Sequence, residues 1–318
     1  MRKYASIHIL SAVSIVLLAI ITLCGVLSWN TSGSFDAVNQ YGETIKMWGS
    51  GIYARDSYMK ATVFIGSDMC ILFVGVPMLA FSVIHDIKRH DKRSRLLLVS
   101  MLAWLLYYAV SICFGVTYNM LFLIYTALFV CLFFSFVTGI YGLSEERFDV
   151  PDKLCGKAYT VFLVLSGIST FAAWFPDIIL SFASGRLQLI EVYTTEITYI
   201  LDMGIISPVA FICLYMLKKR NSFGVVLLSV LLIGIIIVGI MMIFQTFVQL
   251  VSGVDLPIPV IITKSAVFTM VGIYAAVLAG KIYKTIGSGE YHENNSCLQI
   301  KIRLHKKICT VDSRGTWL

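Results

Sequence analysis

The chain has 318 residues, of which 58% are hydrophobic and only 14% are charged, and its formal net charge is +7. About a quarter of the residues of a soluble domain are charged, so this composition excludes an ordinary soluble protein and indicates a chain that lies in lipid. The positive charge does not indicate nucleic-acid binding, because the basic residues are spread along the chain between long apolar runs.

Eight apolar stretches are long enough to cross a bilayer as helices, which takes about 20 residues each. The first follows Met1-Arg2-Lys3 and resembles a signal peptide, but it is longer than such a segment and no small-residue cleavage site follows it. We therefore expect it to be retained as a helix. In chain order the expected spans are 7–29, 61–84, 96–117, 120–143, 158–182, 197–217, 223–249 and 258–280.

The placement of Lys and Arg predicts the orientation of these spans, because cytoplasmic loops carry the excess of positive charge. If the N-terminus is cytoplasmic, all but five of the 25 basic residues fall on the cytoplasmic side. We therefore predict an all-α, polytopic helical membrane protein with both termini in the cytoplasm and a single transmembrane domain over residues 1–284. The five exceptions are Lys46, Arg55, Lys60, Arg186 and Lys264.

Two segments lie outside the expected spans. The only long loop on the outer side, residues 30–60, is rich in Ser, Gly, Asn and Tyr. It is long enough to fold over the helix ends as a lid, and a flexible connector is the alternative interpretation. Residues 285–318 form a basic tail that we predict to be cytoplasmic and disordered.

Asp68 and Asp202 each lie inside a long apolar run. A charge at the centre of a membrane helix costs roughly 2.5 to 3.5 kcal/mol on insertion scales, so such a residue suggests a functional site. Each aspartate opens a similar phrase that ends at a proline, Pro77 or Pro208, where we expect a helix break. The shared phrase is consistent with a tandem repeat of four spans, with halves 1–150 and 151–284, although two short matches in apolar sequence also arise by chance.

Polar residues are expected to converge at one depth in the membrane, because all the ionisable residues recognised within or beside the spans fall on their outer halves. Asp202 shares a helical face with Thr195, Thr198 and Tyr199, and Pro208 is expected to free the carbonyl of Gly204 nearby. Such an oxygen-rich group is suited to a proton or a hard cation. The predicted pocket comprises Asp68, Asp202, Lys264, Thr198, Tyr199, Gln245 and Gln249, with Asp177, Glu196 and Trp174 as weaker candidates and Trp104, Tyr107 and Tyr108 as aromatic residues able to line a cavity.

Lys264 also supports a purely structural alternative. Placed against Asp68 or Asp202, it would neutralise a carboxylate and hold helices in register, because buried polar pairs often fasten membrane helices without any activity. Trp174 has a similar alternative as an interfacial anchor.

The motifs of other functional classes are missing from the sequence. Eight cysteines form no CxxC pair, and five histidines form no HExxH or His-Cys cluster, so we predict no disulfide framework, no metal and no cofactor. No nucleophile elbow, phosphate loop or dinucleotide fingerprint is present. The sequence therefore predicts that the protein is not an enzyme.

The stretches 107–125 and 193–208, which carry the aromatic cluster and the Asp-to-Pro phrase, resemble segments of a family of uncharacterised bacterial multi-pass integral membrane proteins. The resemblance implies a bacterial cytoplasmic membrane and carries no activity. We expect a transporter or a solute- or ion-binding membrane protein with an outward-facing polar pocket, whose partners are the lipid bilayer and a small solute or ion. The alternative is a membrane sensor or scaffold in which the intramembrane charges are structural, with a protein partner that the sequence does not identify.

Overall fold

The computed structural model of the chain describes residues 4–187 and 190–286. Within these residues, eight helices are long and apolar enough to cross a membrane, which confirms the predicted number of spans. Every predicted span overlaps one of them. Their bounds are Ala5–Leu27, Tyr58–Arg89, Lys92–Gly115, Phe122–Ser144, Lys157–Ser184, Ile197–Lys218, Phe223–Val251 and Ile258–Ile286.

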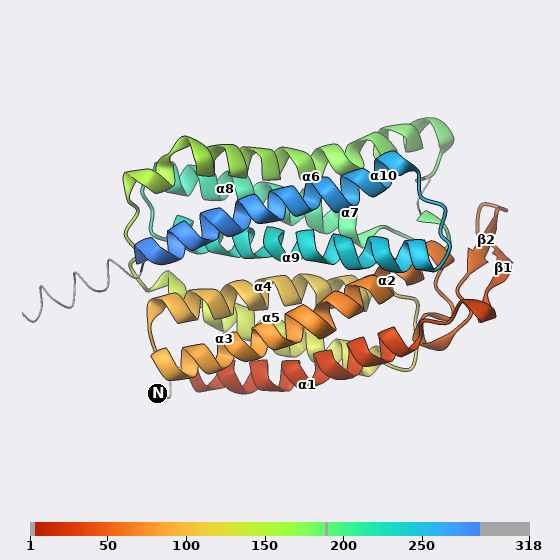
Figure 1. Cartoon of the computed structure of the whole chain (residues 1–318), viewed down its shortest axis with the longest axis horizontal. Helices are drawn as coiled ribbons and strands as arrows, with labels where there is room; N and C mark the ends of the chain where they lie inside the picture. Colours follow the sequence, from red (N-terminus) through yellow and green to blue (C-terminus); the bar gives the residue numbers. More distant parts are fainter. Residues whose placement is uncertain (1–3, 188–189, 287–318) are drawn as a thin grey trace, which may run out of the picture.

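The helices run side by side along the longest axis of the molecule (Figure 1). Helices α1 (Ala5–Leu27), α2 (Tyr58–Cys70), α3 (Val76–Arg89), α4 (Lys92–Gly115) and α5 (Phe122–Ser144) form one layer. The other layer contains α6 (Lys157–Ser184), α7 (Ile197–Leu201), α8 (Ser207–Lys218), α9 (Phe223–Val251) and the last helix, which begins with α10 (Ile258–Ile262). The two layers follow the predicted halves of the sequence, while their origin by duplication stays a prediction.

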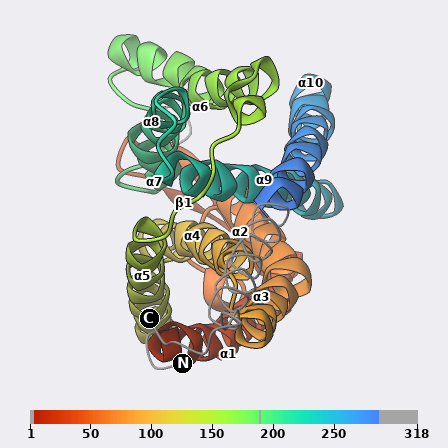
Figure 2. The ribbon, with the colours of Figure 1, turned by 90° about the vertical axis from the view of Figure 1, so that its left-hand side faces the viewer.

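Helix α9 joins the two layers. It packs against α2 and α4 on one side and against α8 on the other, and in the view along the bundle it lies between the ring of α1 to α5 and the outer helices (Figure 2). Helix α6 packs mainly on α8, and the last helix packs on α9. The pair formed by α6 and α8 is therefore peripheral to the ring of α1 to α5.

Both Asp-to-Pro phrases contain a π-helical segment, Ile71–Gly75 in the first and Asp202–Ile206 in the second. Proline cannot donate a backbone hydrogen bond and clashes with the carbonyl four residues earlier. Here the helix widens just before each proline, with Val76 N–H donating to the Ile71 carbonyl and Ser207 N–H to the Asp202 carbonyl. The regular α-helix is therefore interrupted just before Pro77 and Pro208, where the breaks were predicted, and each span continues through a π turn.

The loop predicted over residues 30–60 has its own structure. It contains the antiparallel strands β1 (Phe35–Val38) and β2 (Thr44–Met47), flanked by short 3-10 turns at Thr31–Gly33 and Gly51–Tyr53. Trp48 is completely buried and donates its indole N–H to the Ser28 carbonyl at 2.9 Å. The loop is therefore packed onto the helix ends, as the lid interpretation expected.

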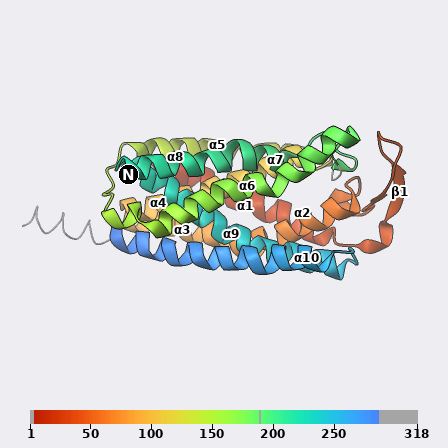
Figure 3. The ribbon, with the colours of Figure 1, turned by 90° about the horizontal axis from the view of Figure 1, so that it is seen from above.

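The hairpin extends beyond one end of the helices (Figure 3), which we call the hairpin end. The start of α1 and the end of the last helix lie at the opposite end, which we call the terminal end (Figure 1). Residues 287–318 lie outside the described residues, so the predicted disorder of the tail stays a prediction.

Candidate functional site

Asp68 is completely buried in α2, and each of its carboxylate oxygens accepts a hydrogen bond from a tyrosine. The Tyr53 hydroxyl donates to Oδ2 at 2.6 Å and the Tyr108 hydroxyl donates to Oδ1 at 2.5 Å. Tyr53 lies in the 3-10 turn of the folded loop and Tyr108 lies on α4. The carboxylate therefore ties the loop, α2 and α4 together through neutral donors.

Helix α1 closes the remaining side of Asp68 at Gly25. A Cβ atom built on Gly25 would lie 1.6 Å from Asp68 Oδ2, so the carboxylate packs directly on the α1 backbone. Any larger residue at position 25 would force one of the two groups to move. The burial of Asp68 thus depends on a glycine 43 positions earlier in the chain.

Asp202 is the second carboxylate, and it begins the π-helical segment of its span. The Tyr107 hydroxyl donates to Oδ1 and the Trp174 indole N–H donates to Oδ2, both at 2.8 Å. Unlike Asp68, it is only partly buried. Three elements, α4, α6 and the π turn, therefore meet at this carboxylate.

Two stacked aromatic pairs flank Asp202. Trp174 stacks on Tyr199 with ring centroids 4.6 Å apart, and Trp104 stacks on Tyr107 with centroids 5.1 Å apart. The Tyr199 hydroxyl donates to Asp177 rather than to Asp202, at 2.8 Å. Because both Trp174 and Tyr107 also bind the Asp202 carboxylate, the aromatic groups fix its orientation.

The charged groups nearest the start of α7 form a separate pair. Glu196, which is 6% exposed, forms an ion pair with Lys60 of α2. The Thr198 hydroxyl donates to the other oxygen of Glu196 at 2.7 Å. Thr198 was expected to line the pocket beside Asp202, but its hydroxyl is bound to Glu196 at the start of α7.

The two glutamines of α9 bind α2. Gln245 donates to the Ser67 hydroxyl at 2.8 Å, and Gln249 donates to the Met59 sulfur at 3.3 Å. A Cβ atom on Gly66 would lie 2.4 Å from the Gln245 Cα, so the two helix backbones touch here. The amides therefore fasten α9 to α2, with Gln245 bound to the residue directly before Asp68.

Lys264 lies in a third π-helical segment, Thr263–Val267. This segment packs on α9, and the Lys264 side chain is outside the described part of the structure. The predicted pairing of Lys264 with an aspartate therefore stays a prediction. Asp68 and Asp202 already have two aromatic donors each, so neither carboxylate depends on Lys264 for its hydrogen bonds.

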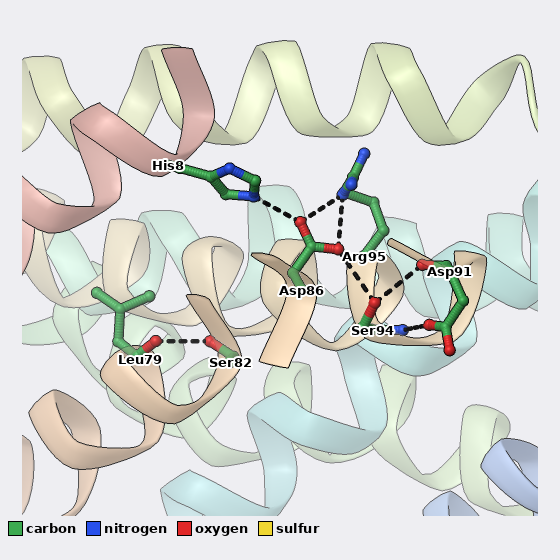
Figure 4. Close-up of polar contacts among 7 residues, drawn as sticks. All are labelled: His8, Leu79, Ser82, Asp86, Asp91, Ser94 and Arg95. Atoms are coloured by element: carbon green, nitrogen blue, oxygen red, sulfur yellow. Dashed lines mark hydrogen bonds and ion pairs between the residues drawn. The ribbon is translucent and has the colours of Figure 1, made fainter. Parts of the chain in front are cut away.

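A further carboxylate cluster lies where α3 ends and α4 begins, a place where no ionisable group was expected within a span; Figure 4 shows its side chains. Asp86 of α3 is completely buried; both its oxygens lie within 2.9 Å of Arg95 Nε, and His8 Nε2 lies 2.7 Å from Oδ2. The Ser94 hydroxyl donates to it at 3.1 Å. Asp86 lies near the end of the candidate span Tyr58–Arg89 and beyond the predicted span 61–84, so the confinement of intramembrane charges to the outer halves stays a prediction. Asp86 was missed because it follows the apolar run by two residues.

At the hairpin end, the loop before α2 is bound to the segment before α7 by a set of polar contacts that we call the clasp. Asn39 and Gln40 donate to the carbonyls of Glu191 and Tyr193 at 3.0 and 3.1 Å. The Ser57 hydroxyl donates to the Glu191 carboxylate. The residues of the clasp are Asn39, Gln40, Glu43, Asp56 and Ser57 on one side and Arg186, Glu191 and Tyr193 on the other, with an ion pair between Glu43 and Arg186.

Asp56 is the buried acid of the clasp. Its Oδ1 accepts hydrogen bonds from the Thr117 N–H and the Tyr193 hydroxyl, both at 2.9 Å. Its Oδ2 has no partner among the described residues, although Asp56 is 0% exposed. Burial raises the pKa of Asp56 to about 6, and the two hydrogen bonds oppose that rise.

Comparison with known proteins does not assign the chain to a family. No protein-family model matches the chain, and neither the curated proteins nor the solved structures contain a significant match. The arguments about function therefore rest on the residues themselves.

Proposed function

We propose that this multi-pass membrane protein is a transporter or a solute- or ion-binding protein whose pocket is centred on Asp202. The eight apolar helices fit a protein embedded in a bilayer. The single observation that carries the proposal is that Asp202 lies inside a span, is only partly buried and, among the described residues, has only neutral hydrogen-bond donors. Such a charge in an apolar span is costly and attracts a proton or another cation.

The position of Asp202 between the ring of α1 to α5 and the peripheral helix α6 also supports the proposal. Tyr107 belongs to α4 in the ring of α1 to α5, whereas Trp174 belongs to the peripheral α6. A movement of the pair formed by α6 and α8 would pull the two donors of Asp202 apart. π-helical segments such as the one that begins at Asp202 are frequent at functional sites.

We place the hairpin end outside the cell and the terminal end in the cytoplasm. The basic residues between α3 and α4 and between α8 and α9 lie at the terminal end, and cytoplasmic loops carry such an excess. We propose a bacterial cytoplasmic membrane as its location, and the sequence resemblance to uncharacterised bacterial membrane proteins supports this proposal. In intact cells, a membrane-impermeant maleimide should label Thr44→Cys but not Lys153→Cys; the reverse pattern would invert the orientation.

The transport proposal is tested with purified protein in liposomes. Proton entry, reported by an internal pH dye, and ²²Na⁺ uptake are measured for the wild type and for Asp202→Asn. We expect at least about a tenfold loss of flux in the variant, because removal of a charge from a hydrogen-bonded site costs about 1.5 to 3 kcal/mol. Asp255→Asn, at an exposed acid outside the spans, is the matched control and should keep wild-type flux. Equal flux in all three proteins would contradict the proposal.

A sensor or scaffold is the second candidate, because one specific observation favours it. Asp68 is completely buried and saturated by Tyr53 and Tyr108, so it acts as a fastener between the folded loop and the helices. In this function the hairpin would contact a protein partner through Phe35, Val38 and Tyr41, which are 50%, 71% and 45% exposed. Crosslinking in membranes that recovers a stoichiometric partner, lost on substitution of these three residues by serine but kept in Asp202→Asn, would favour it.

A further inference from the structure

The clasp lies directly at the mouth of the helices that carry the proposed pocket. Ser57 caps the start of α2, and Lys60, three residues later, pairs with Glu196. Tyr193 precedes Glu196 by three residues, and Asp202 follows six residues after Glu196, a distance of about 9 Å along a helix. Separation of the two sides of the clasp would therefore loosen the approach to Asp202 from the hairpin end.

Asp56 is an acid of the clasp whose charge opposes closure. It is completely buried, and its Oδ2 has no hydrogen-bond partner among the described residues. A charged carboxylate in this position is costly because it has lost water and gained donors on one oxygen only. A proton on Oδ2 removes the charge and leaves Oδ1 free to accept from Thr117 and Tyr193.

Other ionisable groups face Asp56 or its neighbours, and their effects on closure have to be distinguished from that of Asp56. Tyr53 belongs to the same loop, Tyr125 of α5 is electrostatically coupled to both Asp56 and Asp68, and Tyr193 donates to Asp56. Glu191 is partly buried, and burial raises its pKa while the Ser57 hydroxyl and Lys60 lower it. The pKa of Glu191 is therefore raised like that of Asp56, and protonation of Glu191 is the main competing explanation for any effect of pH on closure.

We propose that the clasp is a proton-operated gate over the mouth of the Asp202 pocket, with Asp56 as the group that binds the proton. A proton on Asp56 favours the closed clasp, and loss of the proton favours opening, since an open clasp returns the carboxylate to water. This inference concerns the regulation of the proposed pocket, and its role in transport rests on the proposed function. The opening itself does not require any transported ligand.

The experiment measures the opening directly. Spin labels at Thr44→Cys and Thr194→Cys, two exposed positions on opposite sides of the clasp, report their separation between pH 4 and pH 8 in a background without native cysteines. In the otherwise wild-type protein we expect the short distance to dominate at pH 4 and the longer one to grow above pH 6. Because closure moves the pKa from 3.8 to about 6, linkage allows the ratio of closed to open protein to change by up to about 100-fold.

Two neutral variants assign the effect to a residue. Asp56→Asn is expected to keep the clasp closed over the whole range, because its side chain is uncharged at every pH. Glu191→Gln is expected to retain most of the transition, and Asp36→Asn, at an exposed acid in β1, all of it. A transition that persists in Asp56→Asn, or that is lost in Glu191→Gln alone, would overturn the proposal, as would a wild-type distance that does not depend on pH.

A second measurement serves if the cysteine-free background does not fold. Hydrogen exchange of peptides from 39–57 and 186–196 in the unmodified chain, corrected for the intrinsic effect of pH, should show protection that falls above pH 6 in the wild type and not in Asp56→Asn. Equal protection profiles would contradict the gate. If the clasp opens with pH but Asp202→Asn transports normally, the gate is supported and the proposed function is contradicted. If Asp202→Asn loses flux but the clasp does not respond to pH, the proposed function is supported and the gate is contradicted.

Discussion

Tyr107 and Tyr108 are consecutive residues of α4, yet their hydroxyls bind the two different intramembrane aspartates. Tyr107 donates to Asp202 at 2.8 Å and Tyr108 donates to Asp68 at 2.5 Å. Neighbouring residues of an α-helix point about 100° apart, so α4 lies between the two carboxylates and holds one on each side. The two Asp-to-Pro spans are therefore connected through a single turn of one helix.

The first prediction concerns Asp68 as a fastener. Asp68→Leu removes the only carboxylate that accepts from Tyr53 and Tyr108 and leaves two buried hydroxyls without an acceptor. An unsatisfied buried donor costs about 1 to 3 kcal/mol, so we expect the free energy of unfolding to fall by about 2 to 4 kcal/mol. Reversible unfolding in mixed detergent micelles measures it, and Asp255→Leu is the exposed control. A change below about 1 kcal/mol would show that the two tyrosines find other acceptors.

The second prediction concerns Gly25. Because a Cβ atom at this position would lie 1.6 Å from Asp68 Oδ2, Gly25→Ala should lower the free energy of unfolding by about 2 to 3 kcal/mol through overpacking. Gly280→Ala is the control, since no atom lies within 4 Å of the added methyl group. In an Asp68→Ser background the shorter side chain makes room, so Gly25→Ala should then cost less than about 1 kcal/mol. Additive effects of the two substitutions would contradict the direct contact.

The sequence predicts the membrane spans better than it predicts the contacts between them. Long apolar runs determine which segments can cross a bilayer, and all eight were recognised. The sequence offered Lys264 as a counter-charge for Asp68 or Asp202 in the structural alternative, and it did not identify hydrogen-bond donors for either carboxylate. The structure supplies the neutral donors Tyr53, Tyr107, Tyr108 and Trp174. Any of many aromatic residues could have been such a donor, and only the packing of α4 and of the folded loop selects these four.

The prolines show a second limit of the sequence. Pro77 and Pro208 were expected to end α-helical structure, because proline removes a donor and clashes with the preceding turn. A helix can also respond by inserting one residue into a turn, as it does at Ile71–Gly75 and Asp202–Ile206. The sequence signals the disturbance, but packing against neighbouring helices decides whether the span breaks or widens.

The third prediction concerns the ion pair at the terminal end. Arg95→Met leaves the completely buried Asp86 without its cation, and loss of one partner of a buried pair costs about 3 to 5 kcal/mol. Asp86→Leu combined with Arg95→Met removes both charges and should recover at least half of that loss. Unfolding in mixed micelles compares the single and double variants. A double variant that is less stable than Arg95→Met would contradict this prediction. It would mean that the contacts of His8 and Ser94 with the Asp86 carboxylate stabilise the protein more than the unpaired charge destabilises it.

The fourth prediction concerns the effect of pH on stability through Asp56. Its pKa is about 6 in the folded protein and 3.8 ordinarily, so the folded state binds the proton more tightly than the unfolded state does. The stabilisation by protonation is therefore fully present below about pH 3.8 and is lost as the pH rises through about 6. At pH 7.5, Asp56→Asn should be more stable than the wild type by up to about 3 kcal/mol, and the difference should shrink toward pH 4. Thermal unfolding across this range measures the difference, with Asp36→Asn as the exposed control. A stability difference between Asp56→Asn and the wild type that stays constant with pH would mean that Asp56 keeps its ordinary pKa in the folded protein.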